Sequence, residues 1–401
     1  MRTEPPAALL HSYRSRVAHI ELTSRCNLRC VYCAVSQPTY LGVDLDLSRF
    51  DELVETLAER QVELVWVNGH GETTMIDGWD ALCRRLLARG FKLAIVTNLS
   101  RPLEEAEIET LSRFDQVCVS CDTIDPELFT RLRRKAKLSV LLEGQAQILE
   151  RARRRGAGGP RLSWSCVVSD QTVVGLAELV RKGIDSGVRH FELCNLTQYP
   201  DLPDALKVAH IGTLDLESMR RARVALRDAA RLAEENGCSY SIQAGLLDVL
   251  EHRIQALSAN AAPAAAADPP NAESAPKRTR LCLDPWSMLY VQADGAVRTC
   301  CWKFDPLGRL GKGDSLAAIA NGPELRRLRG QLLSGELAPA CEACPARHWG
   351  TLAQQERAVL RVLASQGALR GALLWRHRRN QALRAVASPL RRALRSLRPD
   401  N

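Results

Sequence analysis

Short apolar runs alternate with amphipathic segments through the first half of the chain. The apolar runs are rich in β-branched residues and occupy positions 16–22, 62–68, 91–98, 116–122, 161–168 and 191–196. The segments between them, such as residues 48–60, repeat apolar residues every three or four positions, with acids early and arginine late, as capped amphipathic helices do. Six strands alternating with helices predict an α/β fold with a parallel sheet, either doubly wound or curled into a barrel, and functional loops at the carboxyl ends of the strands.

The second half of the chain changes character. A helical pattern over residues 214–255 is followed by an alanine- and proline-rich stretch without apolar periodicity, which indicates a linker. Beyond it, two alternating apolar runs flank Asp294-Gly295, which predicts a β-hairpin. We therefore divide the chain into an N-terminal extension (1–15), a core (16–256), a linker (257–280), a small cysteine-bearing domain (281–350) and a tail (351–401).

The formal net charge of +9 is not spread over the molecule. Residues 351–401 contain eleven arginines, no lysine and two acids, so this tail carries the whole excess. The other 350 residues hold equal numbers of basic and acidic side chains, and a body without a net basic field does not attract a polyanion. This balance disfavours a nucleic-acid substrate, and an RNA-modifying enzyme would have to bind RNA through the tail.

The tail has the pattern of a basic amphipathic helix. Apolar residues recur at intervals of three or four, with arginines interleaved, at Leu383, Val386, Leu390, Leu394 and Leu397. Such a helix can lie on anionic lipid, bind an acidic partner or pack against the body. The start of the chain lacks the apolar stretch of a signal peptide, and no run of about 18 apolar residues follows. We expect a cytoplasmic protein, with peripheral contact at the inner membrane surface as one role for the tail.

Cys26, Cys30 and Cys33 follow the first predicted strand, in a C-x3-C-x2-C arrangement. Thiolates are the usual ligands of iron-sulfur clusters, and a cubane needs four ligands to saturate its irons. Three cysteines leave one iron open to a small chelating molecule. The alternative is a zinc site that takes a fourth ligand such as His19.

The run ELTSRCNLRCVYC around these cysteines resembles the signature of the radical S-adenosylmethionine (SAM) superfamily. The resemblance implies a partial (β/α)6 barrel like that of a TIM barrel, and a 4Fe-4S cluster whose open iron binds the amino and carboxylate groups of SAM. It also implies reductive cleavage of SAM to a 5′-deoxyadenosyl radical that abstracts a substrate hydrogen atom. Tyr32 occupies the aromatic position that lies against the adenine in this family, and core packing is its alternative role.

Further family motifs follow in order. Gly69, Gly71 and Glu72 match the Gly-Gly-Glu motif that binds the SAM amino group, although His70 interrupts the glycines, and an ordinary surface turn is the alternative. Three polar residues at later strand ends resemble those that face the SAM carboxylate and ribose, and helix capping is their alternative role. These residues are Asn98, Ser120 and Asp122.

A second cysteine set lies in the small domain. Cys282 and Cys300 flank Gly295, and Cys341 and Cys344 form a C-x2-C pair. This set resembles the SPASM and twitch domains, which bind auxiliary iron-sulfur clusters. No cysteine follows Cys344, so one auxiliary 4Fe-4S cluster fits better than two, with Cys300 preferred over its neighbour Cys301. A structural zinc site would use the same four ligands.

The resemblance implies a radical SAM oxidoreductase that uses the auxiliary cluster as electron acceptor. A radical SAM peptide maturase, which forms cross-links or epimerises residues, and a non-enzymatic zinc-bearing binding protein are the alternatives. The expected partners are a small-molecule or peptide substrate and an electron donor such as flavodoxin or ferredoxin. No residue of the sequence stands out as the catalytic group that acts on the substrate.

Overall fold

The expected parallel sheet is present and extends further than predicted. The computed structural model describes residues 5–12, 14–156, 158–197, 208–243, 246–259, 277–300, 305–310, 315–344 and 346–367. These residues form a ten-stranded sheet in the order β11-β10-β9-β1-β2-β3-β4-β5-β6-β7. Strands β1 to β7 run parallel to one another and β9 pairs parallel with β1, whereas the pairs β9-β10 and β10-β11 at one edge are antiparallel.

All six strands expected in the first half are confirmed. They are β1 (Val17–Ile20), β2 (Leu64–Trp66), β3 (Lys92–Thr97), β4 (Gln116–Ser120), β5 (Arg161–Val168) and β6 (His190–Asn195). The uninterrupted helical region expected over residues 214–255 is wrong, because β7 (Ser239–Ile242) separates two helices there and pairs with β6. Its sequence, SYSI, is short and half polar, so it carries little apolar signal.

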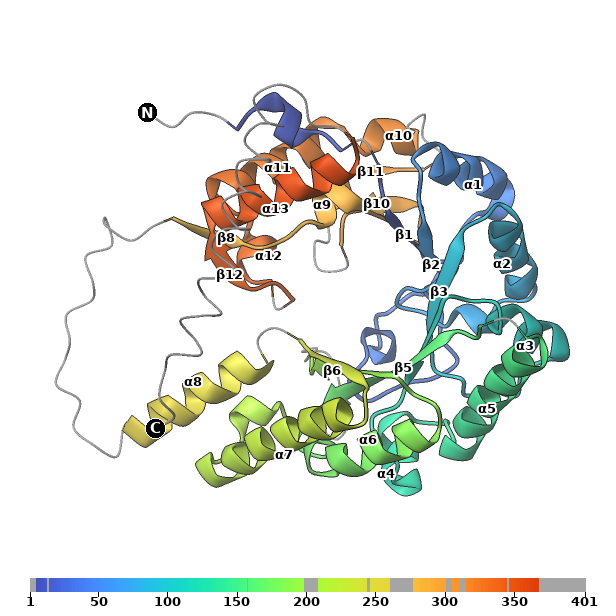
Figure 1. The fold of residues 1–401 in the computed structure, drawn as a ribbon, viewed down its shortest axis with the longest axis vertical. Coiled ribbons are helices and arrows are strands. Elements are labelled where there is room, and N and C mark those ends of the chain that lie inside the picture. The colour runs from blue at the N-terminus through green and yellow to red at the C-terminus, as the bar shows by residue number, and fades with distance from the viewer. Residues whose placement is uncertain are drawn as a thin grey trace.

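Helices cover the outer side of the sheet (Figure 1). Each presents an apolar stripe to the strands, as in α2, whose Trp79, Cys83 and Leu86 are buried. The helices of this part are α1 (Phe50–Glu59), α2 (Trp79–Ala88), α3 (Glu105–Leu111), α4 (Pro126–Leu132), α5 (Leu138–Arg154), α6 (Leu176–Asp185), α7 (Leu216–Glu235) and α8 (Leu246–Ala259).

The predicted C-terminal hairpin is confirmed and continues the main sheet. It consists of β9 (Met288–Val291) and β10 (Ala296–Arg298), joined by a turn in which Gly295 has a φ of 79°. Strand β9 lies parallel to β1, with Val17 opposite Met288 and Ile20 opposite Val291. The cysteine-bearing segment is therefore joined to the edge of the barrel sheet by backbone hydrogen bonds.

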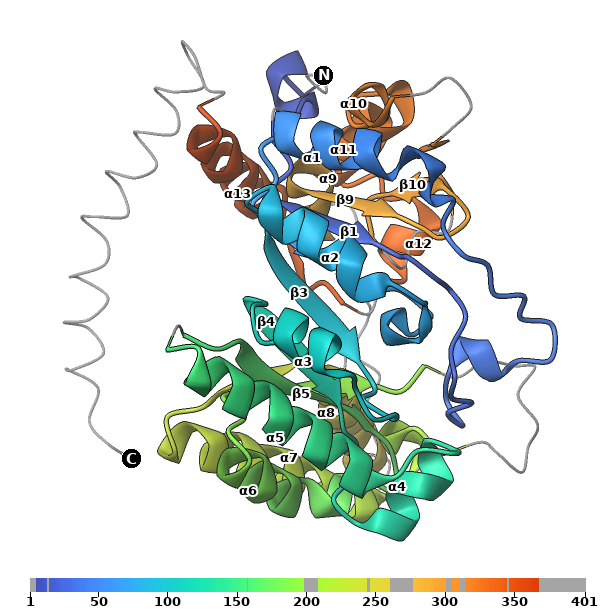
Figure 2. The ribbon, with the colours of Figure 1, turned by 90° about the vertical axis from the view of Figure 1, so that its right-hand side faces the viewer.

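A second, smaller core lies beside β9. Leu9 of the N-terminal segment packs there with Trp286, Leu332 and Val359. Figure 2 shows the N-terminal turn near α11 and α13. The elements of this part are α9 (Asp284–Ser287), β11 (Gly308–Arg309), α10 (Leu316–Ile319), α11 (Pro323–Ser334), α12 (Pro339–Glu342), α13 (Leu352–Ser365) and a two-stranded sheet of β8 (Arg278–Arg280) with β12 (Trp349–Thr351).

The fully buried Arg329 links these elements. Its guanidinium donates to the carbonyl oxygens of Leu10, Pro285 and Ala320, so one side chain joins the N-terminal segment, α9 and the end of α10. The residues predicted to form the amphipathic tail helix, from Leu383 on, lie outside the described residues. Within the part of the chain that the structure describes, no helix has the length and apolar content to cross a bilayer.

Candidate functional site

The three cysteines of the first motif lie in one loop at the carboxyl end of β1. Cys30 is buried, and Cys26 and Cys33 are half-buried. Burial raises the pKa of Cys26 to about 11 and that of Cys30 to about 12, and the Coulomb repulsion of Cys33 adds to both shifts. The repulsion between the ionised forms shows that the three sulfurs lie close together. Because their pKa values are raised, these thiols are protonated at neutral pH when no metal is bound. A metal site that binds them must therefore displace their protons.

Asn98, at the end of β3, is placed against the first cysteine. Its Nδ2 lies 3.8 Å from Cys26 Sγ and 3.0 Å from Asn27 Oδ1, and the Leu28 amide donates to the same sulfur at 3.4 Å. Hydrogen bonds to sulfur tune the potential of a cluster held there. The structure thus brings Asn98 to the cysteine loop, while its predicted contact with SAM stays a prediction.

The loop with Gly69 and Gly71 packs directly on the segment that precedes Cys26. The Glu72 amide donates to the Arg25 carbonyl at 2.8 Å, and a Cβ at position 71 would overlap the carbonyl oxygens of Arg25 and Thr23. A Cβ on Gly69 would overlap the Glu21 carboxylate in the same way. Both glycines are thus required by close packing of the two loops, whatever further contact they make with SAM.

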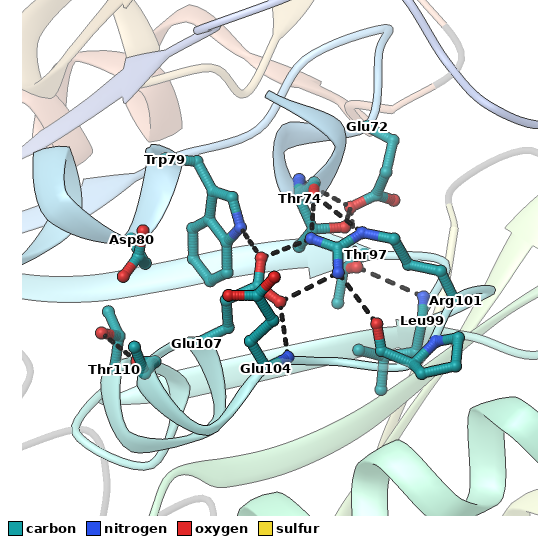
Figure 3. A network of polar contacts seen from close by, with 12 residues as sticks. Glu72, Thr74, Trp79, Asp80, Thr97, Leu99, Arg101, Glu104, Glu107 and Thr110 are labelled. Carbon is teal, nitrogen blue, oxygen red and sulfur yellow. Dashed lines mark hydrogen bonds and ion pairs between the residues drawn. The ribbon is translucent and has the colours of Figure 1, made fainter. Parts of the chain in front are cut away.

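Glu72 is buried and its carboxylate faces into the protein (Figure 3). Oε1 accepts from the hydroxyls of Thr74 and Thr97, both at 2.8 Å, and Oε2 accepts from the Asn98 amide at 2.8 Å. These bonds fix the β2 loop to the end of β3. A carboxylate has about four acceptor positions, so Oε2 keeps capacity for one more donor, as the predicted ammonium contact requires.

The buried Glu21 was not predicted as a functional residue. It lies directly after β1, where Oε1 accepts from the His70 amide at 2.5 Å and Oε2 accepts from the Ala293 amide at 3.1 Å. One carboxylate therefore joins the cysteine-loop strand, the glycine loop and the turn between β9 and β10. Its partners are far apart in the sequence, so no local pattern marks it.

Asp122 and Tyr32 meet in a buried network around Arg133. Arg133 Nε and Nη2 lie 2.8 and 3.0 Å from the two oxygens of Asp122, the Tyr32 hydroxyl donates to Asp122, and the Val167 amide donates to it at 2.9 Å. Asp122 does not cap α4, because Asp125 does so. Three hydrogen bonds and the close approach of Arg133 Nε already surround the Asp122 carboxylate, so the predicted contact with the SAM ribose would have to displace one of these groups.

Ser120 remains the least constrained of the predicted SAM ligands. It is half-buried at the end of β4, opposite Ser165 of β5. Its neighbour in the pleat, Val119, is fully buried on the opposite, helix-covered side. Ser120 therefore lies on the inner face of the sheet, and its contact with SAM stays a prediction.

The second cysteine set borders one cavity of about 530 Å³. Cys282, Cys300, Cys341 and Cys344 all line it. Burial raises the pKa of Cys282 well above its usual range, with Asp284 adding to the shift. Cys301, the alternative to Cys300, lies outside the described residues. The four thiols thus share a space large enough for a multi-atom group.

The other wall of this cavity belongs to the barrel. His19 of β1, Gly69 and His70 of the glycine loop, Glu192 of β6 and Gln243 after β7 line it. Because β1 and β6 lie five places apart in the sheet, they can border one cavity only if the sheet is curled, which agrees with a partial barrel. The cavity therefore extends from the glycine loop, which packs on the segment before Cys26, to the auxiliary cysteines.

His19 is held by aromatic neighbours, although it was weighed as a zinc ligand. It stacks on Trp66 with 5.9 Å between ring centroids and meets Tyr290 edge-on at 5.6 Å. Burial lowers its pKa to about 4, so it is neutral at physiological pH.

Among the described residues, no three His, Cys, Asp or Glu side chains converge on one point as ligands of a single ion do.

Comparison with known families finds a matching family model for each of the two segments that carry cysteine motifs. Residues 20–178 match the model of the radical SAM superfamily, and residues 282–345 match that of the iron-sulfur cluster-binding domain called SPASM. The chain belongs to the radical SAM superfamily. The first match begins at the end of β1 and contains Cys26, Cys30 and Cys33, and the second contains the four cysteines of the cavity.

Curated relatives match a little under half of this radical SAM protein. The GTP 3′,8-cyclase of Pseudomonas putida is 31% identical over 193 residues, which are 44% of this chain and 53% of the cyclase. A cofactor-modifying protein for tungsten-containing aldehyde ferredoxin oxidoreductase from Pyrococcus furiosus is 25% identical over 49% of this chain and 56% of its own length. The chain thus spans about half the length of the curated relatives it matches.

Solved structures extend the likeness in fold to most of the chain. SuiB of Streptococcus suis, solved with its precursor peptide SuiA, superposes with a TM-score of 0.55 at 15% identity, over 79% of this chain and 67% of SuiB. The enzyme anSMEcpe, solved with bound SAM, gives 0.53 at 15% identity over 90% of this chain and 98% of its own. At such identities the likeness is one of fold.

The family and its domain imply SAM, a 4Fe-4S cluster and an auxiliary iron-sulfur cluster as cofactors. The residues present fit these groups. The three neighbouring thiols of the half-buried loop would provide an incomplete ligand set that leaves one iron for SAM, and the four thiols around the cavity would provide a complete set.

Replacing Asp122 by asparagine removes the countercharge of the buried Arg133. We expect Asp122→Asn to lower the free energy of unfolding by about 3–5 kcal/mol, because an uncompensated charge stays in the core. Urea denaturation of the anaerobically reconstituted protein, followed by circular dichroism, measures this. Asp125→Asn is the matched control, since asparagine caps a helix as well as aspartate does. Equal stabilities of the two variants would contradict the assigned network.

Proposed function

We propose that this radical SAM enzyme oxidises a substrate bound in the cavity between the barrel and the auxiliary cysteines. The observation that carries the proposal is the shared lining of this cavity. His70 of the glycine loop and Glu192 of β6 border it on one side, and Cys282, Cys300 and Cys344 border it on the other. A substrate there would contact the SAM-binding side of the barrel and the auxiliary site at the same time.

The bound groups would supply a carbon radical from SAM that removes one hydrogen atom and, at the auxiliary cysteines, an acceptor for the electron left behind. A closed-shell product then requires that the substrate also lose a proton. The net change is a two-electron oxidation of the substrate, in the oxidoreductase class. The protein must therefore place a proton acceptor within the same cavity.

Glu192 is the group that we assign to accept this proton. It lies on β6 between Phe191 and Leu193, which are buried on the helix-covered side, so its carboxylate lies on the inner face of the sheet. Among the described residues, no hydrogen bond or ion pair to this carboxylate is found. Burial raises its pKa above the usual value of 4.5, which makes it a better base near neutral pH.

A peptide side chain is one substrate class that this cavity can accept. SuiB was solved with a precursor peptide, and anSMEcpe was solved with a bound peptide as well as SAM, and both share this fold. A maturase that cross-links or epimerises a peptide would use the same radical step. An oxidised product has lost two hydrogen atoms and gained a double bond. A cross-linked product has lost two hydrogen atoms and gained a bond between two residues, and an epimerised product has lost none.

The proposal is tested by following SAM cleavage in the reconstituted enzyme with dithionite as the reductant. Wild-type protein should form 5′-deoxyadenosine, and Cys26→Ala should form none. Cys282→Ala should still form it, because the auxiliary site acts after cleavage, but should yield no oxidised product. Cys83→Ala, at a fully buried cysteine in α2, is the control. Equal 5′-deoxyadenosine from wild type and Cys26→Ala would contradict the proposal.

The raised pKa of Glu192 makes a separate prediction about stability. An acid with a raised pKa in the folded state stabilises the fold below its unfolded pKa, and this contribution is lost as pH rises through the folded pKa. Glu192→Gln should therefore melt at a higher temperature than wild type at pH 8, with a difference that shrinks towards pH 5. Scanning calorimetry at several pH values measures this. A difference that does not change with pH would contradict a desolvated, ionisable Glu192.

A further inference from the structure

Arg280 holds the segment that carries two of the auxiliary cysteines. It is the last residue of β8, and its guanidinium donates to the carbonyl oxygens of Glu342 at 2.6 Å and Arg347 at 2.8 Å. Glu342 directly follows Cys341, and Arg347 comes three residues after Cys344. One planar group therefore holds both ends of the C-x2-C turn.

The orientation of this guanidinium is fixed by an aromatic ring. Its central carbon lies 4.2 Å from the centroid of the Trp349 ring, on the strand that pairs with β8. Arg280 also lines the cavity beside the cysteines, and its Nε is buried without a hydrogen-bond partner in the described part of the chain. Because Arg280 lines the same cavity as Cys341 and Cys344 and binds the carbonyl of the residue after Cys341, its guanidinium lies beside this cysteine pair.

Among the described residues, no carboxylate forms an ion pair with Arg280, and the through-space attraction of Glu342 offsets its charge only in part. The second arginine at this site, Arg347, is different, because its Nη2 lies 2.7 and 2.8 Å from the two oxygens of Asp284. The carboxylate therefore offsets the charge of Arg347. Arg280, which is held by carbonyl groups and has no ion pair, therefore adds positive charge beside Cys341 and Cys344.

We propose that Arg280 is a positioning residue that raises the reduction potential of the auxiliary cluster. A positive charge beside the cysteine sulfurs stabilises the more negative, reduced state of a cluster, and net charge and hydrogen bonds to sulfur are known to set cluster potentials. The higher potential makes the auxiliary site a better acceptor for the single electron that the substrate gives up. The inference rests on the proposed function, because that function places an iron-sulfur cluster at these cysteines.

The test is a redox titration of the auxiliary cluster, monitored by electron paramagnetic resonance. The full chain carries Cys26→Ala, so that the auxiliary signal is observed alone. Adding Arg280→Met should lower the equilibrium constant for one-electron reduction of the auxiliary cluster at least tenfold, which corresponds to a reduction potential lower by about 59 mV. Arg280→Lys, which keeps the charge but cannot hold both carbonyl groups, should lower it by a smaller amount. Arg278→Met is the matched control, since Arg278 lies on the same strand and near the same ring but does not line the cavity.

The outcomes separate this inference from the proposed function. If Arg280→Met keeps its cluster and titrates within threefold of the Arg278→Met control, the inference is overturned. If Arg280→Met loses its iron, Arg280→Gln decides, because it removes the charge but keeps a hydrogen-bond donor, and a glutamine variant that titrates like the control overturns the inference equally. If the Cys26→Ala parent itself binds no iron, the proposed function fails first, which iron analysis shows before any titration.

Discussion

The parallel pairing of β1 with β9 is the constraint on which both sites depend. Strand β1 leads into the loop of Cys26, and β9 leads into the turn that precedes Cys300. The pairing continues beyond β1, where the Glu21 amide donates to the Val291 carbonyl at 2.8 Å and the Glu21 carboxylate accepts from Ala293. Backbone hydrogen bonds thus set the separation of the two cysteine sites. A short separation would let a substrate lie close to both of them, as electron transfer to an auxiliary cluster requires.

Buried charge is distributed unevenly around the two sites, and this has chemical consequences. Behind the first loop, Asp122 and Arg133 neutralise one another and hold Tyr32, so this network fixes geometry without adding net charge. At the auxiliary site, Arg280 adds a positive charge next to the sulfurs. In the cavity between them, Glu192 has no partner among the described residues. Buried charged groups without an ion-pair partner lower the stability of a protein, and they are found where a substrate or cofactor supplies the missing partner.

The sequence predicted the parts of the fold that have local signals. The six strands of the first half have long β-branched runs, and the cysteine motifs have fixed spacings. Strand β7 could not be predicted, because its alternation of polar and apolar residues covers only four positions. Features that depend on contacts between residues far apart in the chain could not be predicted either. These are the pairing of β9 with β1 and the roles of Glu21, Arg133 and Arg280. Glu21 could be recognised only once the hairpin was placed at the edge of the barrel, and Arg280 only once β8 was paired with β12.

The claim that this chain holds two separate iron-sulfur clusters, one at each cysteine set, is tested most directly by metal and sulfide analysis of cysteine variants. The anaerobically reconstituted wild-type protein should contain about eight irons with matching sulfide, as expected for two 4Fe-4S clusters. Cys26→Ala and Cys282→Ala should each retain about four, and the double variant almost none. Stoichiometric zinc in place of iron at the second site, or iron lost from both sites in either single variant, would contradict the account.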